Sequence, residues 1–160
     1  MKYLSFLILI ATISFYGCEE KEKPYIPVQL CSDMTNNIDS INKYIHGTWK
    51  WVEEKRYNRI TREYEYATPK DYGYNLTQIF SGDTLKFFKN TTPDSVYQFK
   101  IQRELEISNI PTDSTTVVAY YSFYTMQSRG YVAIMICKNQ LLMLHDTYRD
   151  GIGRTLWMRD

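Results

Sequence analysis

The chain has few of the residues that catalytic and metal sites use most often: two histidines, three cysteines and seven glycines among 160 residues. His46 and His145 show no HxH or HxxxH spacing, which leaves a metal site without a sequence signature. The glycines are scattered and form no phosphate-binding loop. His145 and Asp146 have no G-x-S-x-G nucleophile to act on. We therefore expect no metal, no cofactor and no enzymatic activity, with a hydrolase as the least favoured alternative.

The sequence also lacks an excess of one charge. Nineteen Lys and Arg residues oppose eighteen Asp and Glu residues, which gives a net charge of +1. Proteins that bind nucleic acids attract the phosphates with clustered positive charge, so we expect no nucleic-acid partner. Glu53 and Glu54 are adjacent, and on a strand they point to opposite faces. They cannot form an acid–base pair, and we interpret both as solvated charges.

A hydrophobic run of membrane-spanning length is missing as well. Lys2 precedes residues 4–15, twelve residues without a charge, whereas a transmembrane helix needs about 20 apolar residues. A charged start, a short apolar middle and a small residue at the exit are typical of a secretory signal. We expect residues 1–17 to be a signal peptide that directs export.

The end of this run resembles a bacterial lipobox, in which a small residue precedes a lipid-modified cysteine. Gly17 and Cys18 match that pattern, and Phe15 and Tyr16 stand where it usually has Leu and a small residue. The resemblance implies that Cys18 becomes the mature N-terminus and carries acyl chains such as palmitate. Each buried CH₂ of these chains would contribute about 0.8 kcal/mol to membrane binding. It implies a lipoprotein anchored at the cell envelope, with the leaflet left open.

The residues that follow Cys18 predict a tether and then a short helix. The stretch "EEKEKPYIPVQL" has a charge run and two prolines but no apolar periodicity, so residues 18–38 are expected to be a flexible spacer. In "IDSINKYI" (38–45), Ile38, Ile41 and Ile45 have helical spacing, with Asp39 or Ser40 near the start. We expect one folded domain over residues 39–160.

From Gly47 onward the sequence favours β-structure, as its 16% aromatic content and 15 tyrosines suggest. The clearest strand is 96–107, where apolar and polar residues alternate except at Arg103. Seven further runs lie between turn-forming residues: "TWKWVEEKRY", "NLTQIF", "TLKFF", "TVVAYYSFYTM", "YVAIMIC", "QLLMLHD" and "RTLWMRD". About eight short antiparallel strands predict an all-β, up-and-down barrel, with a two-sheet sandwich as the alternative.

Three motifs carry a resemblance to a known family. The segments "GTWKWV", "TPKDYGYNLTQIF" and "TYRDGIGRTLWMR" occur in that order between Gly47 and Arg159. In the residues of these segments and in their order, the chain is similar to small lipocalin-like lipoproteins of Bacteroidota. The resemblance implies a lipocalin-like barrel in which Gly47, Trp49 and Arg159 form a structural signature. The Arg159 guanidinium is expected to cover the Trp49 indole at the closed barrel end, a contact that contributes about 0.5–2 kcal/mol.

An eight-stranded barrel can be filled by side chains or can hold one small ligand. We expect a non-enzymatic module that binds a small apolar or amphipathic ligand, lined by Trp51, Tyr97 and Phe99. Tyrosine and tryptophan suit such a site because they join an apolar body to a polar tip. The alternative is an accessory, interaction or inhibitor lipoprotein with a filled barrel and an unknown protein partner.

Two cysteines remain besides Cys18. An exported protein can keep a disulfide, so a bond between Cys31 and Cys137 stays open. We favour free thiols, because Cys31 lies in the expected tether and Cys137 ends an apolar run as a packed core thiol would. Four D-[ST] sites, "DSI", "DTL", "DSV" and "DST", resemble O-glycosylation sites of exported bacterial proteins, but ordinary turn formation is the favoured interpretation.

Overall fold

A computed structural model describes residues 25–104, 115–122, 128–147 and 151–159. Side chains are described outside residues 104–131 and 145–152. The expected signal peptide, the lipidation site Cys18 and the first part of the tether therefore lie outside the described residues. So do two apolar residues of the predicted strand, Leu105 and Ile107, and the side chain of His145.

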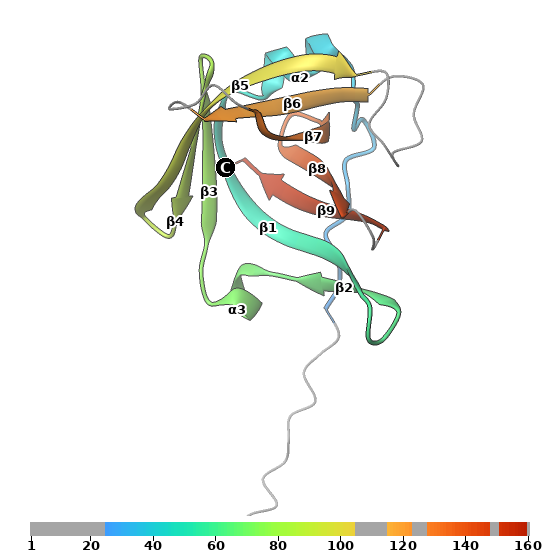
Figure 1. Cartoon of the computed structure of the whole chain (residues 1–160). Coiled ribbons are helices and arrows are strands. Elements are labelled where there is room, and N and C mark those ends of the chain that lie inside the picture. Colours follow the sequence, from blue (N-terminus) through green and yellow to red (C-terminus); the bar gives the residue numbers. More distant parts are fainter. Residues whose placement is uncertain (1–24, 105–114, 123–127, 148–150, 160) are drawn as a thin grey trace, which may run out of the picture.

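The described residues form nine strands and two helices. In chain order they are α2 (Ile38–Tyr44), β1 (Gly47–Asn58), β2 (Glu63–Ala67), α3 (Pro69–Tyr72), β3 (Leu76–Ser81), β4 (Thr84–Lys89), β5 (Thr92–Glu104), β6 (Thr115–Ser122), β7 (Ser128–Ile136), β8 (Gln140–Thr147) and β9 (Gly151–Met158). Each strand from β3 to β9 pairs antiparallel with the next, and β1 pairs with both β3 and β9 (Figure 1). The eight strands β1 and β3–β9 thus close into a ring, which confirms the predicted small all-β barrel and contradicts the two-sheet sandwich.

The predicted helix over residues 38–45 is confirmed and covers one end of the barrel (Figure 1). Asn37, rather than Asp39 or Ser40, caps it by accepting hydrogen bonds from the amides of both. Ile41 and Ile45 are fully buried and join the aromatic residues of the barrel interior in one core. We call this the closed end.

Trp49 and Arg159 meet at the closed end as the resemblance implies. The guanidinium carbon of Arg159 lies 4.4 Å from the centroid of the fully buried Trp49 ring. The indole N–H of Trp49 donates to the carbonyl of Ile45 at 2.7 Å, which ties β1 to the end of α2. This cation–π contact confirms that part of the predicted signature.

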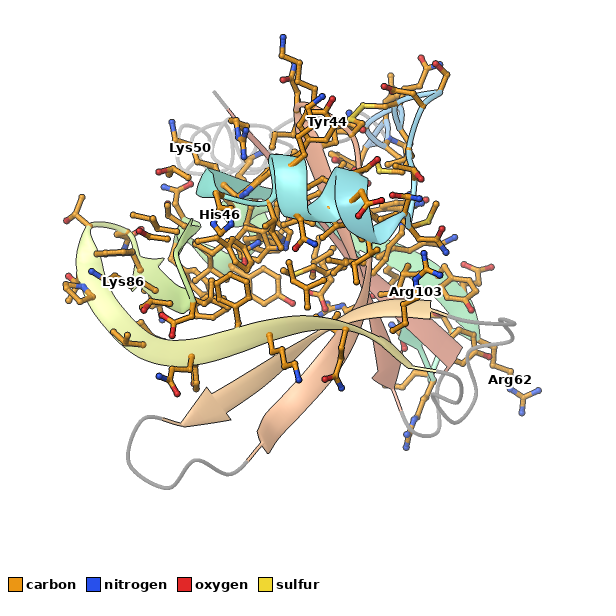
Figure 2. The ribbon with its side chains drawn as sticks, turned by 90° about the horizontal axis from the view of Figure 1, so that it is seen from above. Tyr44, His46, Lys50, Arg62, Lys86 and Arg103 are labelled. Atoms are coloured by element: carbon orange, nitrogen blue, oxygen red, sulfur yellow. A yellow bond between two sulfur atoms is a disulfide. The ribbon has the colours of Figure 1, made fainter. Side chains whose placement is uncertain are left out.

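Gly47 makes room for the arginine. Its φ of +126° is one that other residues rarely adopt, and an added Cβ would lie 3.3 Å from Nη2 of Arg159. The same Nη2 donates to the carbonyls of Tyr44 and His46, the latter at 2.6 Å. Figure 2 shows Tyr44 and His46 close to α2. Arg159, the last described residue, therefore holds the end of the described chain against α2 and β1.

The residues of β1 that face the barrel interior change from odd-numbered to even-numbered halfway along the strand. Trp51 pairs with Trp157 of β9, whereas Glu53 pairs with Leu156, so one extra residue is inserted between them as a β-bulge. Trp51 lies in the core before the bulge. After it Glu54, opposite Thr155, faces inward and Glu53 faces outward. The two glutamates do point to opposite faces, as predicted.

Glu53 is not the solvated charge that the sequence suggested. Its side chain is 1% exposed, and one carboxylate oxygen accepts hydrogen bonds from the Tyr25 hydroxyl at 2.7 Å and the Val28 amide at 2.9 Å. Arg154 of β9 places Nη2 3.6 Å from the other oxygen. A buried carboxylate needs such partners to offset the loss of hydration.

Residues 25–37, which we call the N-terminal segment, lie against the outside of the barrel and do not form part of a free tether. The amide of Cys31 donates to the side chain of Gln140 at 2.9 Å, and Gln140 donates back to the carbonyl of Gln29 at 3.0 Å. Thr35 and Ile136 exchange two backbone hydrogen bonds. The expectation of a flexible spacer over residues 18–38 is therefore wrong for residues 25–37.

A disulfide between Cys31 and Cys137 joins the N-terminal segment to the end of β7. The interpretation of the two cysteines as free thiols was wrong. Its premise was that Cys31 belongs to a mobile tether, whereas hydrogen bonds hold this part of the chain beside Cys137.

β2 and α3 were not predicted. Within the described strands β2 pairs only with the second half of β1, and "EYEYA" has no aliphatic alternation to mark it. α3 is a single turn with Pro69 in its first turn and a capping box between Thr68 and Asp71. Gly73 ends it with a φ of +70°.

We predict that replacing both cysteines, Cys31→Ser with Cys137→Ser, lowers the free energy of unfolding by about 2–4 kcal/mol. The bond joins residues 106 apart in sequence, so its loss gives the unfolded chain much more freedom. Urea unfolding of the wild type and the double variant, with and without reductant, measures the effect. Reductant should destabilise only the wild type; a wild type that reductant leaves unchanged would contradict the bond.

We predict that Arg159→Met lowers the free energy of unfolding by about 2 kcal/mol, because the cation–π contact and two charge-assisted hydrogen bonds are lost. Arg103→Met, at an exposed position of β5, is the matched control and should change stability by less than about 0.5 kcal/mol. Urea unfolding monitored by tryptophan fluorescence measures both. Equal effects at the two sites would show that the closed end does not depend on Arg159.

Candidate functional site

A pocket of about 300 Å³ opens at the end of the barrel that carries α3, away from the closed end. β1, β9 and the segment from α3 to β3 supply its walls. Its lining consists of Trp51, Glu54, Arg56, Tyr72, Tyr74, Leu76, Gly153, Thr155 and Trp157. Four of these nine residues are aromatic, while Glu54 and Arg56 bring opposite charges into the same space.

Three aromatic rings form one wall of the pocket. The centroid of Trp51 lies 5.4 Å from that of Tyr72, in an edge-to-face arrangement, and 6.4 Å from that of Tyr74. The two tyrosines are 5.6 Å apart. Such offset and tilted contacts fix the rings in place. The wall therefore offers a preformed apolar surface for a flat group.

A chain of hydrogen bonds crosses the polar side of the pocket. Arg56 donates from Nη1 to the Tyr72 hydroxyl at 3.0 Å, and that hydroxyl donates to Oε2 of Glu54 at 3.0 Å. Burial raises the pKa of Tyr72 above its usual value of 10.0, and the hydrogen bond to Glu54 raises it further. Tyr72 is therefore a neutral donor at physiological pH and holds the carboxylate and the guanidinium in a fixed relation.

Among the residues that the structure describes, the indole N–H of Trp51 finds no hydrogen-bond partner, although the side chain is only 6% exposed. By contrast, the indole N–H of Trp157 donates to the Thr155 hydroxyl at 3.1 Å. A buried donor without a partner is unfavourable, by about 1–3 kcal/mol. Trp51 thus gives the pocket wall a hydrogen-bond donor that is still to be satisfied.

Of the three predicted lining residues, Trp51 lines this pocket and Tyr97 and Phe99 do not. Phe99 packs edge-on against Phe80 in the core, with centroids 5.1 Å apart. Tyr97 packs against Phe87 at 5.9 Å. The alternation of β5 correctly indicated an inward face, but that part of the interior is filled by side chains.

Sequence reasoning missed Glu54, Arg56, Tyr72 and Tyr74. The first two face the pocket only because of the bulge in β1, which no residue pattern marked. The tyrosines flank Gly73, whose left-handed conformation turns the chain between them. The segment "TPKDYGY" belongs to one of the motifs that carry the family resemblance, and its Pro69 and its Thr68–Asp71 capping box are the sequence signal for an ordered turn.

A second, larger groove of about 590 Å³ adjoins the pocket where β1 passes from β3 to β2. Trp51 and Leu76 line both spaces. Lys50, Val52 and Thr77 are among its other walls. The pocket and the groove lie on either side of Trp51 and Leu76 and together form one concave surface.

Among the described residues, one group with metal-ligand atoms comes together: Cys31, Asp33 and Cys137. Its two sulfur atoms are bonded to each other, so neither is a thiolate ligand. At two of the D-[ST] sites the hydroxyl hydrogen-bonds to the preceding aspartate, Thr84 to Asp83 and Ser95 to Asp94.

No family model, curated protein or solved structure matches this chain. In the part of the chain that the structure describes, no helix has both the length and the apolar character to cross a membrane.

We predict that Tyr72 titrates above the usual tyrosine pKa of 10.0 and that Glu54→Gln lowers its pKa only in part. The hydrogen-bonded carboxylate is then gone, but burial, the larger cause, remains. The difference in ultraviolet absorbance between each protein and its Tyr72→Phe derivative, recorded after rapid pH jumps, isolates this residue. Glu63→Gln, at an exposed position of β2, should leave the pKa unchanged; an equal shift there would contradict the role of Glu54.

Proposed function

We propose that this protein is an exported lipoprotein, anchored at the cell envelope through acylated Cys18, whose barrel binds a small, flat, amphipathic ligand without changing it chemically. The observation that carries the binding role is the pocket wall of Trp51, Tyr72 and Tyr74 beside the Arg56–Tyr72–Glu54 hydrogen-bond chain. Ligand sites commonly combine apolar walls with a few fixed polar groups.

The size of the pocket limits the ligand. About 300 Å³ is at the small end of the range for small-molecule sites. The interior beyond Trp51 is filled, since Trp49, Phe80 and Leu85 are at most 1% exposed. A ligand of one or two rings therefore fits at the barrel end, with its face on the aromatic wall and a polar edge toward Arg56 or Glu54.

The pocket's chemistry favours binding over catalysis. The described residues that line it include no histidine, cysteine or serine, and their hydroxyl groups belong to Tyr72, Tyr74 and Thr155. The raised pKa of Tyr72 makes this hydroxyl a poor base at neutral pH, because it keeps its proton. These groups suit hydrogen bonding that orients a ligand.

A second candidate function is that of an accessory or interaction lipoprotein. The filled interior favours it, because the closed half of the barrel leaves no room for a ligand. In that case the open pocket and the adjoining groove would receive a side chain of a protein partner. Saturable binding of a free small molecule distinguishes the two candidates.

We predict saturable binding of one molecule of 1-naphthalenesulfonate, followed by isothermal titration calorimetry, because its two fused rings match the aromatic wall and its sulfonate matches Arg56. Tyr74→Ser should weaken binding by about fivefold or more, the effect of losing about 1 kcal/mol of ring contact. Tyr97→Ser is the matched control outside the pocket and should leave the affinity unchanged.

A neutral probe, 1-naphthol, separates the polar contribution. Arg56→Gln should weaken binding of the sulfonate and leave binding of the naphthol nearly unchanged. If neither probe saturates, or if Tyr97→Ser weakens binding as much as Tyr74→Ser, the ligand site is not this pocket. The intact mass of the protein purified from its own membranes tests the anchor separately, since acylation at Cys18 adds the mass of the acyl chains.

A further inference from the structure

The hairpin formed by β1 and β2, residues 55–66, projects at the end of the barrel away from α2 (Figure 1). Ile60 at its turn is 94% exposed, the most exposed large apolar side chain among those the structure describes. Arg62 is the last residue of the turn, with a φ of +59°, and Figure 2 shows its side chain directed away from the ribbon. An apolar tip beside a cation is therefore presented to the surroundings.

The hairpin carries a positive charge excess in an otherwise balanced chain. It contains four basic residues, Lys55, Arg56, Arg59 and Arg62, and two acidic ones, Glu63 and Glu65. The Glu65 carboxylate accepts a hydrogen bond from Asn58 at 2.5 Å and lies 3.9 Å from Arg56, on the pocket side. The net charge of this short segment is +2, from four positive and two negative groups.

Tyrosines line the other face of the hairpin. Tyr57 and Tyr64 pair across the strands with centroids 5.4 Å apart, and Tyr66 lies 5.8 Å from Tyr25. The Lys55 ammonium lies over both Tyr64, at 4.4 Å, and Tyr66, at 5.8 Å. Tyrosine and basic residues of this kind are enriched where proteins meet the headgroups of a bilayer.

The chain enters the structure next to this hairpin. Tyr25, where the described N-terminal segment begins, contacts Tyr66. Six residues lie between Cys18 and Tyr25, so even a fully extended connection of seven steps spans at most about 25 Å. If Cys18 is fixed in a bilayer, the hairpin is among the parts of the protein that must lie nearest to it.

We propose that the hairpin rests in the headgroup region of the bilayer that holds Cys18, with Ile60 at the boundary to the acyl chains and Arg59 and Arg62 beside anionic headgroups. This inference rests on the proposed lipid anchor. The short connection favours a lipid surface over a protein partner, because the acyl chains bring that surface within reach of the hairpin.

The test uses the full mature chain, acylated at Cys18, in phosphatidylcholine vesicles that contain phosphatidylglycerol and a lipid with a nitroxide on its headgroup. A fluorophore is attached at Thr61→Cys in the hairpin or, as a matched position, at Lys86→Cys. Figure 2 shows Lys86 and Arg62 on opposite sides of the molecule. We expect quenching at position 61 to be severalfold stronger than at position 86.

Substitutions then test whether Ile60 and Arg62 hold the hairpin at the bilayer. Ile60→Asp with Arg62→Glu should remove the excess quenching at position 61. Val96→Asp with Lys100→Glu makes the same chemical changes at exposed positions of β5 and should leave it intact. Equal quenching at positions 61 and 86, in a wild type that floats with the vesicles, overturns the hairpin inference and leaves the anchor standing.

A wild type that does not float overturns the anchor and the hairpin inference together. A third outcome concerns a protein partner. If position 61 is not quenched in lipid vesicles but is shielded from a soluble quencher in native membranes, the hairpin contacts protein, and the lipid inference is wrong.

Discussion

The β-bulge between Trp51 and Glu53 is the constraint on which the rest of the structure depends. Before it, β1 contributes apolar residues to the core and pairs with β3; after it, the strand pairs with β2. One inserted residue reverses which side chains face inward, because strand faces alternate with a period of two. Glu54 and Arg56 therefore line the pocket, and Glu53 is turned to the outside. Without the insertion, the charged pair would face solvent and the open end of the barrel would lack its polar groups.

The outward turn of Glu53 also determines where the N-terminal segment lies. The carboxylate binds Tyr25 and Val28, and the disulfide at Cys31 fixes the same segment to the end of β7. Leu142 and Leu156 share the outward parity of their strands, yet they are at most 4% exposed, as expected beneath a covering segment. The polar contacts thus position the segment, and the burial of apolar surface beneath it adds the larger free-energy gain.

Whether a feature of the fold could be predicted from the sequence depends on how far apart in the chain its interacting residues lie. Alternation identified the main strands, and the order of motifs placed Trp49 against Arg159, because both signals lie within single elements or in a resemblance that spans the barrel. The bulge, the unmarked strand β2 and the disulfide depend on which segments meet in space. Tyr97 and Phe99 were assigned to the correct face but not to the pocket, since alternation does not tell a filled interior from an open one.

The pocket and the tyrosines of the hairpin lie on opposite faces of the same stretch of β1. Arg56 lines the pocket, while Lys55, its neighbour in sequence, lies over the tyrosines of the opposite face. A hairpin seated on the bilayer would therefore bring the pocket to the membrane side of the barrel, separated from the headgroups by little more than one strand pair. A small amphipathic molecule partitions into that interface, with its ring among the acyl chains and its polar edge in water. The aromatic wall and the Arg56–Tyr72–Glu54 chain offer the same division of apolar and polar surface, so the two proposals point to a ligand exchanged with the lipid surface.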